Sequence, residues 1–166
     1  DHGEDTLNHG FMGHRIELHD ATTQVPLMVR LPKAQRKTGR VKDLAQLLDV
    51  APTVLGLAGV AVPDSMEGLS LQGCIVGEGC TTSGVAVSEA VDKLVSATDG
   101  TFRLTVDGLE AHDGAVDDAM AHPTAPQVQL WDVGGPPGSD TELPLEKLPA
   151  ARIQQLADLA RAQRAR

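Results

Sequence analysis

The sequence of 166 residues predicts a mixed α/β fold. Three observations support this class: apolar stretches of strand length, a helical apolar pattern in the first half, and an amphipathic pattern at the end of the chain. Apolar residues make up 41% of the sequence, which lies within the range of chains that bury a core. We therefore expect one domain, or a large piece of one.

The first half is expected to hold a loop, a strand and a helical region. Residues 1–24 are polar, carry four of the six histidines and lack a clean period, which favours a site-bearing loop with at most a short helical turn. Residues 25–32 form a β-branched and apolar run bounded by prolines, typical of a buried strand. Apolar residues then recur at helical spacing over residues 41–57. Pro52 should interrupt this helix or begin a second one, and Gly59 should end it.

The second half predicts strands followed by a closing helix. Residues 85–87, 102–106 and 127–133 have strand character, and Asp99-Gly100 gives a turn signal before the second run. Residues 149–166 predict an amphipathic helix, whose inward face is formed by Ile153, Leu156 and Leu159.

The chain is acidic. It has 14 Lys and Arg against 23 Asp and Glu, a net charge of 14 − 23 = −9, which argues against attraction to nucleic acid or anionic lipid. No stretch approaches the roughly 18 uninterrupted apolar residues of a membrane helix. We therefore expect no nucleic-acid partner and no membrane partner. The acidic, turn-rich stretch 107–126, including His112 and His122, is interpreted as solvated surface.

The chain has two cysteines, Cys74 and Cys80. They enclose a five-residue segment with two glycines that could bend to close a disulfide, and the alternative is two free thiols. A disulfide would suggest an oxidising compartment. A zinc site is the weaker interpretation, because no second Cys or His pair stands nearby at ligand spacing.

The densest group of chemically competent residues is Asp1-His2-Gly3-Glu4, followed by His9 and His14. An adjacent carboxylate and imidazole can ligate one divalent cation, and Gly3 lets the backbone turn tightly beneath them. His9 and His14 could donate protons or pair with an anion. The alternative for such a polar segment is an ordinary surface loop.

These residues resemble the sulfatases of the alkaline phosphatase superfamily. The resemblance begins with Asp1-His2-Gly3-Glu4, His9-Gly10, His14 and Val25-Pro26-Leu27. It continues, in the same order as in sulfatases, from Asp43-Leu44 through Leu48–Gly59, which is similar to a "V-D-x-A-P-T-x-L-x-L-A-G" stretch of many sulfatases, and then through Gly68–Leu71 and Gln129–Val133. The ordered set is stronger evidence than any one motif.

The resemblance implies roles for four residues. Asp1 and His2 fall on a pair of divalent-metal ligands, with Ca²⁺ the expected ion and Mg²⁺ or Mn²⁺ as alternatives. His14 falls where relatives place a Lys or His that contacts the sulfate group and helps the leaving oxygen depart, and His9 is expected to line the same pocket. Asn8 stands where Glu is usual.

The C-x-P-S-R or S-x-P-S-R motif of the family does not occur in this sequence. Its Cys or Ser is converted to formylglycine, the nucleophile. The resemblance therefore implies the C-terminal portion of an alkaline-phosphatase-like sulfatase fold, with a small antiparallel sheet plus a C-terminal helix. The N-terminal half of the same protein would be its partner, would carry the formylglycine, and would be needed for activity. Residues 1–71 would complete the large α/β domain, and residues 72–166 would form a smaller C-terminal subdomain.

The function implied is metal-dependent hydrolysis of a sulfuric ester, on a small molecule or a glycan, in a periplasmic or secreted protein. The Asp-His pair is shared with phosphodiester and phosphonate hydrolases and with phosphoglycerol transferases of the superfamily, so these remain alternatives. A non-catalytic sulfatase-like fragment is a further alternative.

Overall fold

The computed structural model describes residues 1–10, 12–14, 18–33, 38–90, 94–106, 128–136 and 138–164. These residues form two compact units. We call Asp1–Val25 with Val87–Arg166 the sheet unit, and Pro26–Ala86 the helical unit. The predicted stretch of solvated surface at 107–126 lies outside the described residues.

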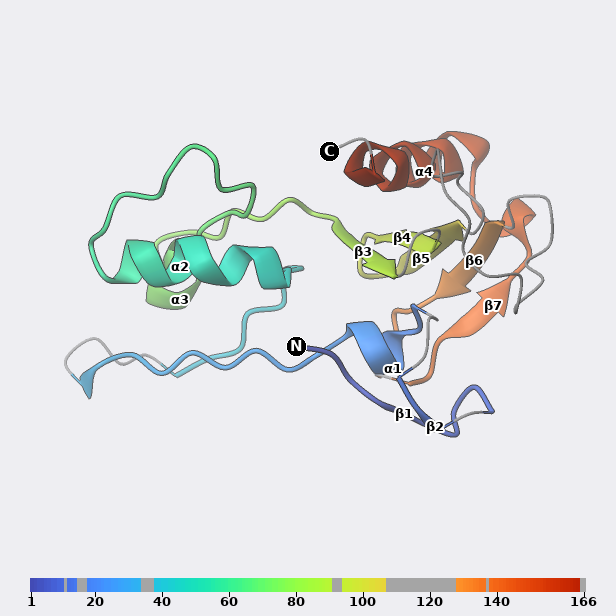
Figure 1. Ribbon diagram of the computed structural model, residues 1–166, viewed down its shortest axis with the longest axis horizontal. Helices are drawn as coiled ribbons and strands as arrows, with labels where there is room; N and C mark the ends of the chain where they lie inside the picture. Colours follow the sequence, from blue (N-terminus) through green and yellow to red (C-terminus); the bar gives the residue numbers. More distant parts are fainter. Residues whose placement is uncertain are drawn as a thin grey trace, which may run out of the picture. The chain divides into compact units, whose positions relative to one another are not determined.

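A five-stranded sheet forms the centre of the sheet unit (Figure 1). Its strands are β3 (Ala86–Ala90), β4 (Leu94–Thr98), β5 (Phe102–Val106), β6 (Val128–Asp132) and β7 (Thr141–Leu143). They lie in sequence order, and β4–β5, β5–β6 and β6–β7 are antiparallel pairs. The turn between β4 and β5 is fixed by Asp99, whose carboxylate accepts the Thr101 and Phe102 amides.

One face of the sheet packs against α4 (Ala150–Arg164), which follows the short helix η3 (Leu145–Lys147) (Figure 1). Leu156 of α4 is fully buried, and Ile153 and Leu159 pack at the edge of the same core. The sheet contributes alternate residues of its strands to this core, as strand geometry requires: Val95, Ala97, Leu104, Val106 and Leu130. The predicted mixed α/β fold with a small antiparallel sheet and a C-terminal helix is confirmed.

The opposite face of the sheet is polar. Arg103 of β5 and Trp131 of β6 are paired across the strands and buried, and the guanidinium lies 5.5 Å from the centre of the indole ring. The rings of His9 and His19 meet the indole edge-on, with ring centres 6.2 and 4.8 Å away. This face therefore receives the N-terminal segment, which contains β1 (Asp5–Thr6), β2 (Met12–Gly13) and α1 (Asp20–Thr23).

The helical unit contains η2 (Leu47–Asp49), α2 (Val50–Leu57) and α3 (Gln72–Val76). The buried Asp49 carboxylate accepts the Gln46 and Leu69 amides, and the Thr53 hydroxyl accepts the Leu71 amide. A side chain at Gly68 would collide with the Leu48 carbonyl. The sulfatase-like residues of this stretch therefore hold two loops against α2 through buried, satisfied polar groups.

Two predictions for this unit need correction. Residues 25–32 form no strand, and Met28 is 89% exposed. An apolar run becomes a strand only when it pairs with a partner strand, and no such strand lies beside it among the described residues. The helical region begins at Leu47 with the 3-10 turn η2, and α2 begins at Val50 rather than near Val41; Asp49 caps the Gln46 amide at this start. Pro52 does lie in the first turn of α2, and Gly59, with φ of 71°, ends it as predicted.

Other local predictions can also be compared with the structure. Cys74 and Cys80 form a disulfide. The strand predicted at 102–106 is present as β5, and the one predicted at 127–133 is present as β6 over Val128–Asp132, while β4 and β7 were not predicted. Within the described residues, none of the helices has the length and apolar character needed to cross a membrane. The division into domains at residue 71 stays a prediction.

Candidate functional site

The N-terminal segment begins with a small antiparallel ladder, β1 against β2. Its register pairs Asp5 with Gly13 and Thr6 with Met12. Continuing this register by one position places Glu4 opposite His14. Because side chains alternate between the two faces of a strand, Asp5 points into the sheet unit while Glu4 points away from it.

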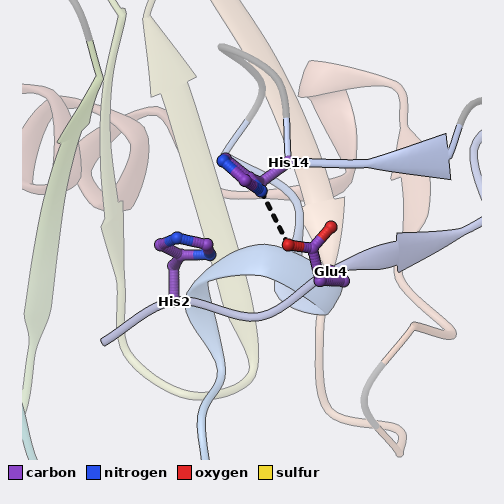
Figure 2. A group of neighbouring side chains, drawn as sticks. All are labelled: His2, Glu4 and His14. Carbon is purple, nitrogen blue, oxygen red and sulfur yellow. Dashed lines mark hydrogen bonds and ion pairs between the residues drawn. The ribbon is translucent and has the colours of Figure 1, made fainter.

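On the exposed face, Glu4, His14 and His2 lie side by side (Figure 2). His14 Nδ1 donates a hydrogen bond to Glu4 Oε1 at 2.7 Å. The rings of His2 and His14 have centres 4.2 Å apart and are tilted by 39°. Because Nδ1 of His14 is hydrogen-bonded to Glu4, Nε2 is the ring nitrogen that can bind a ligand.

The backbone beneath His2 is fixed by Gly3. The Gly3 amide donates to the Thr22 carbonyl at 2.8 Å, and a Cβ at Gly3 would lie 2.1 Å from the Ala21 carbonyl oxygen. His2 Nδ1 donates to the Gly3 carbonyl at 2.9 Å, and its Nε2 lies 4.0 Å from Asp1 Oδ1. The predicted metal pair therefore presents one nitrogen and one carboxylate at a separation that a single cation can bridge.

Calcium takes six to eight oxygen ligands. In the described part of the chain, Asp1 offers an exposed carboxylate and His2 a nitrogen, so these two residues alone do not make a calcium site. They can supply a part of one.

On the buried face, His9 lies between two carboxylates. Its Nδ1 donates to Asp5, and its Nε2 lies 2.8 Å from Asp140 Oδ1. Burial alone would lower the pKa of His9, but the hydrogen bond to Asp5 and the negative charges of Asp140 and Asp5 raise it above its usual value. The pKa of Asp5 is lowered, because its hydrogen bonds with His9 outweigh the effect of burial.

Asp140 connects this face to the sheet. Arg103 Nη2 donates to Asp140 Oδ2, and His19, whose ring is stacked on that of His9 at 3.7 Å, lies 3.6 Å from the same oxygen. Burial opposes ionisation of Asp140, but its contacts with His19, Asp20 and Arg103 hold its pKa well below the usual range. Burial and the neighbouring Asp140 carboxylate raise the pKa of Asp20 to about 6.

The structure therefore separates the residues singled out from the sequence. Asp1, His2 and His14 lie on the exposed face, whereas His9 is turned to the other face with both ring nitrogens beside carboxylates. Its assignment to the pocket stays a prediction.

Sequence reasoning left Asp5, Arg103 and Asp140 without roles. The alternation of the β1–β2 ladder could have revealed Asp5. No local signal identifies Asp140, which comes from the β6–β7 connection.

Comparisons with known proteins find sulfatases similar to the first half of this chain. Residues 7–83 match the family model of the C-terminal region of N-sulphoglucosamine sulphohydrolase. The resemblance to the C-terminal portion of a sulfatase is thus confirmed over a stretch that includes His9 and His14.

Individual relatives are sulfatases as well. Arylsulfatase K of Bos taurus is 32% identical over 71 residues, which is 43% of this chain and 13% of the relative. From Bacteroides thetaiotaomicron, N-acetylglucosamine-6-O-sulfatase is 34% identical over 73 residues (44% and 13%), and Delta 4,5-hexuronate-2-O-sulfatase is 34% identical over 80 residues (47% and 17%). The matched stretch thus covers less than one fifth of each of these relatives.

Proposed function

We propose that this chain forms part of the active site of a sulfatase that hydrolyses sulfuric esters. The observation that carries the proposal is the coincidence of two findings. The stretch that matches sulfatases begins at residue 7 and includes His14, and the ladder of β1 and β2 brings His14 beside His2 and Glu4 on an exposed face. The imidazoles of His2 and His14 are open to solvent there and can donate hydrogen bonds to an anionic ester, while a cation bound in the site would offset the carboxylates of Asp1 and Glu4.

In this proposal Asp1 and His2 contribute ligands to a divalent cation, with Ca²⁺ expected and Mg²⁺ or Mn²⁺ as alternatives. The cation would neutralise charge that develops on the ester oxygens. The remaining ligands and the formylglycine nucleophile belong to the N-terminal half of a sulfatase, which is the partner we propose for this chain.

His14 is the residue that we propose to contact the sulfate group. The carboxylate of Glu4 accepts a hydrogen bond from Nδ1, so Nε2 is the ring nitrogen that is directed away from Glu4. An N–H held in this direction can donate to a sulfate oxygen or to the leaving oxygen. His9, between Asp5 and Asp140, supports the ladder that carries His14.

The substrate class we propose is a sulfate ester of a small molecule or a glycan. The names of the relatives, which include sulfatases of N-acetylglucosamine and of hexuronate, support the glycan alternative. A periplasmic or secreted location is supported by the Cys74–Cys80 disulfide.

The test is hydrolysis by the chain produced together with any in-frame upstream coding sequence. 4-Nitrophenyl sulfate and a sulfated monosaccharide are the sulfate substrates, and bis-4-nitrophenyl phosphate and a phosphonate monoester are the comparisons. We expect release of sulfate that requires a divalent cation and is lost in His14→Ala. Faster turnover of the phosphorus substrates would move the function to the phosphodiester and phosphonate hydrolases. No turnover of any substrate would leave a non-catalytic sulfatase-like protein.

A further inference from the structure

Glu4 lies on the exposed face of the β1–β2 ladder, and the proposed reaction gives it no part of its own. Its Oε1 lies 2.7 Å from His14 Nδ1, and the two side chains point toward one another (Figure 2). We propose that Glu4 is a positioning residue for His14, because it determines which ring nitrogen of His14 meets the ester. This inference rests on the proposed function, in which His14 contacts the sulfate group.

The chemistry of the contact determines where the His14 ring carries its proton. An ionised carboxylate only accepts hydrogen bonds, so the ring nitrogen beside it must carry a proton. Nδ1 of His14 therefore keeps its proton in the neutral ring and in the protonated ring, and the two states differ only at Nε2. When Nε2–H passes to the leaving oxygen, that oxygen gains the proton and the ring is left neutral, with Nδ1–H still donated to Glu4. A carboxylate that orients an imidazole in this way is a general feature of catalytic histidines.

The backbone holds Glu4 and His14 opposite each other. The pairing of Asp5 with Gly13 continues by one position to these two residues. Gly13 has a φ of 102°, which glycine adopts without strain, and it sets the direction of the chain directly before His14. On the other segment, the Gly3 amide donates to the Thr22 carbonyl directly before Glu4. The hydrogen bond therefore joins two anchored segments of chain.

Glu4 orients His14 rather than His2. The His2 ring has a different hydrogen-bond partner, since its Nδ1 donates to the Gly3 carbonyl at 2.9 Å. Among the described residues, His14 is the one that donates a hydrogen bond to the Glu4 side chain. Such a carboxylate is useful only to a histidine at this position, because a lysine ammonium has three equivalent donors and no tautomers.

The first test is ¹⁵N NMR of the histidine rings in the full chain, at a pH at which the His14 ring is neutral. The His14 signals are assigned by their absence from His14→Gln. We expect the form with Nδ1–H to dominate in the wild type. Glu4→Gln should raise the ratio of the Nε2–H form to the Nδ1–H form by at least about threefold, because an amide can accept or donate and so fixes neither form.

Glu146→Gln, an exposed glutamate on η3, is the matched control and should keep the wild-type ratio. The side chains of Glu4 and His14 are more than half exposed, so their variants should retain the fold, which Trp131 fluorescence checks. If Glu4→Gln has lost the folded signal, Glu4→Ala replaces it. The same ratio of the two forms in the wild type and in the Glu4 variant would overturn the inference.

The second test is turnover of 4-nitrophenyl sulfate by the protein used to test the proposed function. Glu4→Gln should lower kcat/KM by at least about fivefold beside His14, but by less than about twofold in a His14→Lys background, because lysine has no ring to orient. A merely structural effect of Glu4 on the ladder would appear in both backgrounds. An equal effect in the two backgrounds, including none, would therefore overturn the inference. If no ester is hydrolysed, the proposed function fails, while the NMR measurement still decides whether Glu4 fixes the ring, so the two failures are distinguishable.

Discussion

His9 Nε2 lies 2.8 Å from Asp140 Oδ1, and this contact joins the β1–β2 ladder to the connection between β6 and β7. Asn8 adds a second link, since its amide donates to the Gly138 carbonyl at 2.6 Å. Both links lie in the sheet unit, on the side of the sheet that faces away from α4. His2 and His14, the exposed residues to which we give roles in the proposed reaction, therefore lie on one face of the β1–β2 ladder. On its other face, buried ion pairs of His9 with Asp5 and Asp140 fix the ladder to the sheet.

Asp140→Asn should destabilise the sheet unit by about 3–5 kcal/mol. The substitution keeps the shape but removes the charge opposite Arg103 and His9, and a buried cation left without its partner carries a cost of this order. Urea unfolding followed by the fluorescence of Trp131, the one tryptophan of the chain, measures the change. Glu142→Gln on the exposed part of β7 is the control, with an expected change under about 1 kcal/mol. Equal stability of the two variants would contradict the role given to Asp140.

The stability of the sheet unit should be greatest in weakly acid solution. The pKa of His9 is raised, so its contribution is complete below the unfolded pKa of 6.5 and is lost as the pH rises through the folded pKa. Asp20 acts in the same direction: with a folded pKa of about 6 against 3.8, it lowers stability as the pH rises between these values. Asp5 and Asp140 have lowered pKa values, so their contribution is lost as the pH falls below 3.8.

Urea midpoints at intervals from pH 3 to pH 9 measure this dependence. Asp20→Asn should reduce the slope between about pH 4 and pH 6, because the substituted side chain no longer titrates. A wild-type midpoint that rises steadily from pH 5 to pH 8 would be inconsistent with the directions given for His9 and Asp20.

The sequence predicts those elements that depend on local patterns. The apolar spacing of Ile153, Leu156 and Leu159 indicates α4, and the alternation of residues 102–106 indicates β5. The short glycine-bearing loop made the Cys74–Cys80 pair possible, although the sequence left free thiols open. In each case the information lies within a few residues of chain.

Elements and contacts that depend on distant residues are not predicted. The apolar run at 25–32 has the composition of a strand, but pairing needs a second chain segment that the local pattern cannot supply. β7 spans only Thr141–Leu143 and has no apolar run of its own. The ion pairs of Asp140 with His9 and Arg103 form only when β5, β6 and the N-terminal segment come together, so no local spacing in the sequence predicts them.

Gly3→Ala should disrupt the exposed cluster by moving its backbone. The added methyl would lie 2.1 Å from the Ala21 carbonyl oxygen, so the segment must shift and lose the hydrogen bond from the Gly3 amide to Thr22. We expect a loss of about 1–3 kcal/mol in the stability of the sheet unit, as for other overpacked sites. Gly39→Ala is the control, because nothing lies within 4 Å of its Cβ position. If Gly3→Ala were as stable as the wild type, the close packing of Gly3 against the Ala21 carbonyl would not be required for folding, which would contradict this prediction.

Asp49→Ala should loosen the helical unit without affecting the sheet unit. The substitution leaves the Gln46 and Leu69 amides without their acceptor, and because both hydrogen bonds are only part-buried we expect a total cost of about 1–3 kcal/mol. Hydrogen exchange read by NMR tests this directly: the Leu69 amide should exchange faster in Asp49→Ala, while amides of β5 keep their wild-type rates. The exposed Asp64→Ala is the matched control and should leave both sets unchanged. Unchanged protection of Leu69 in Asp49→Ala would mean that this sulfatase-like motif acts through contacts other than these two hydrogen bonds.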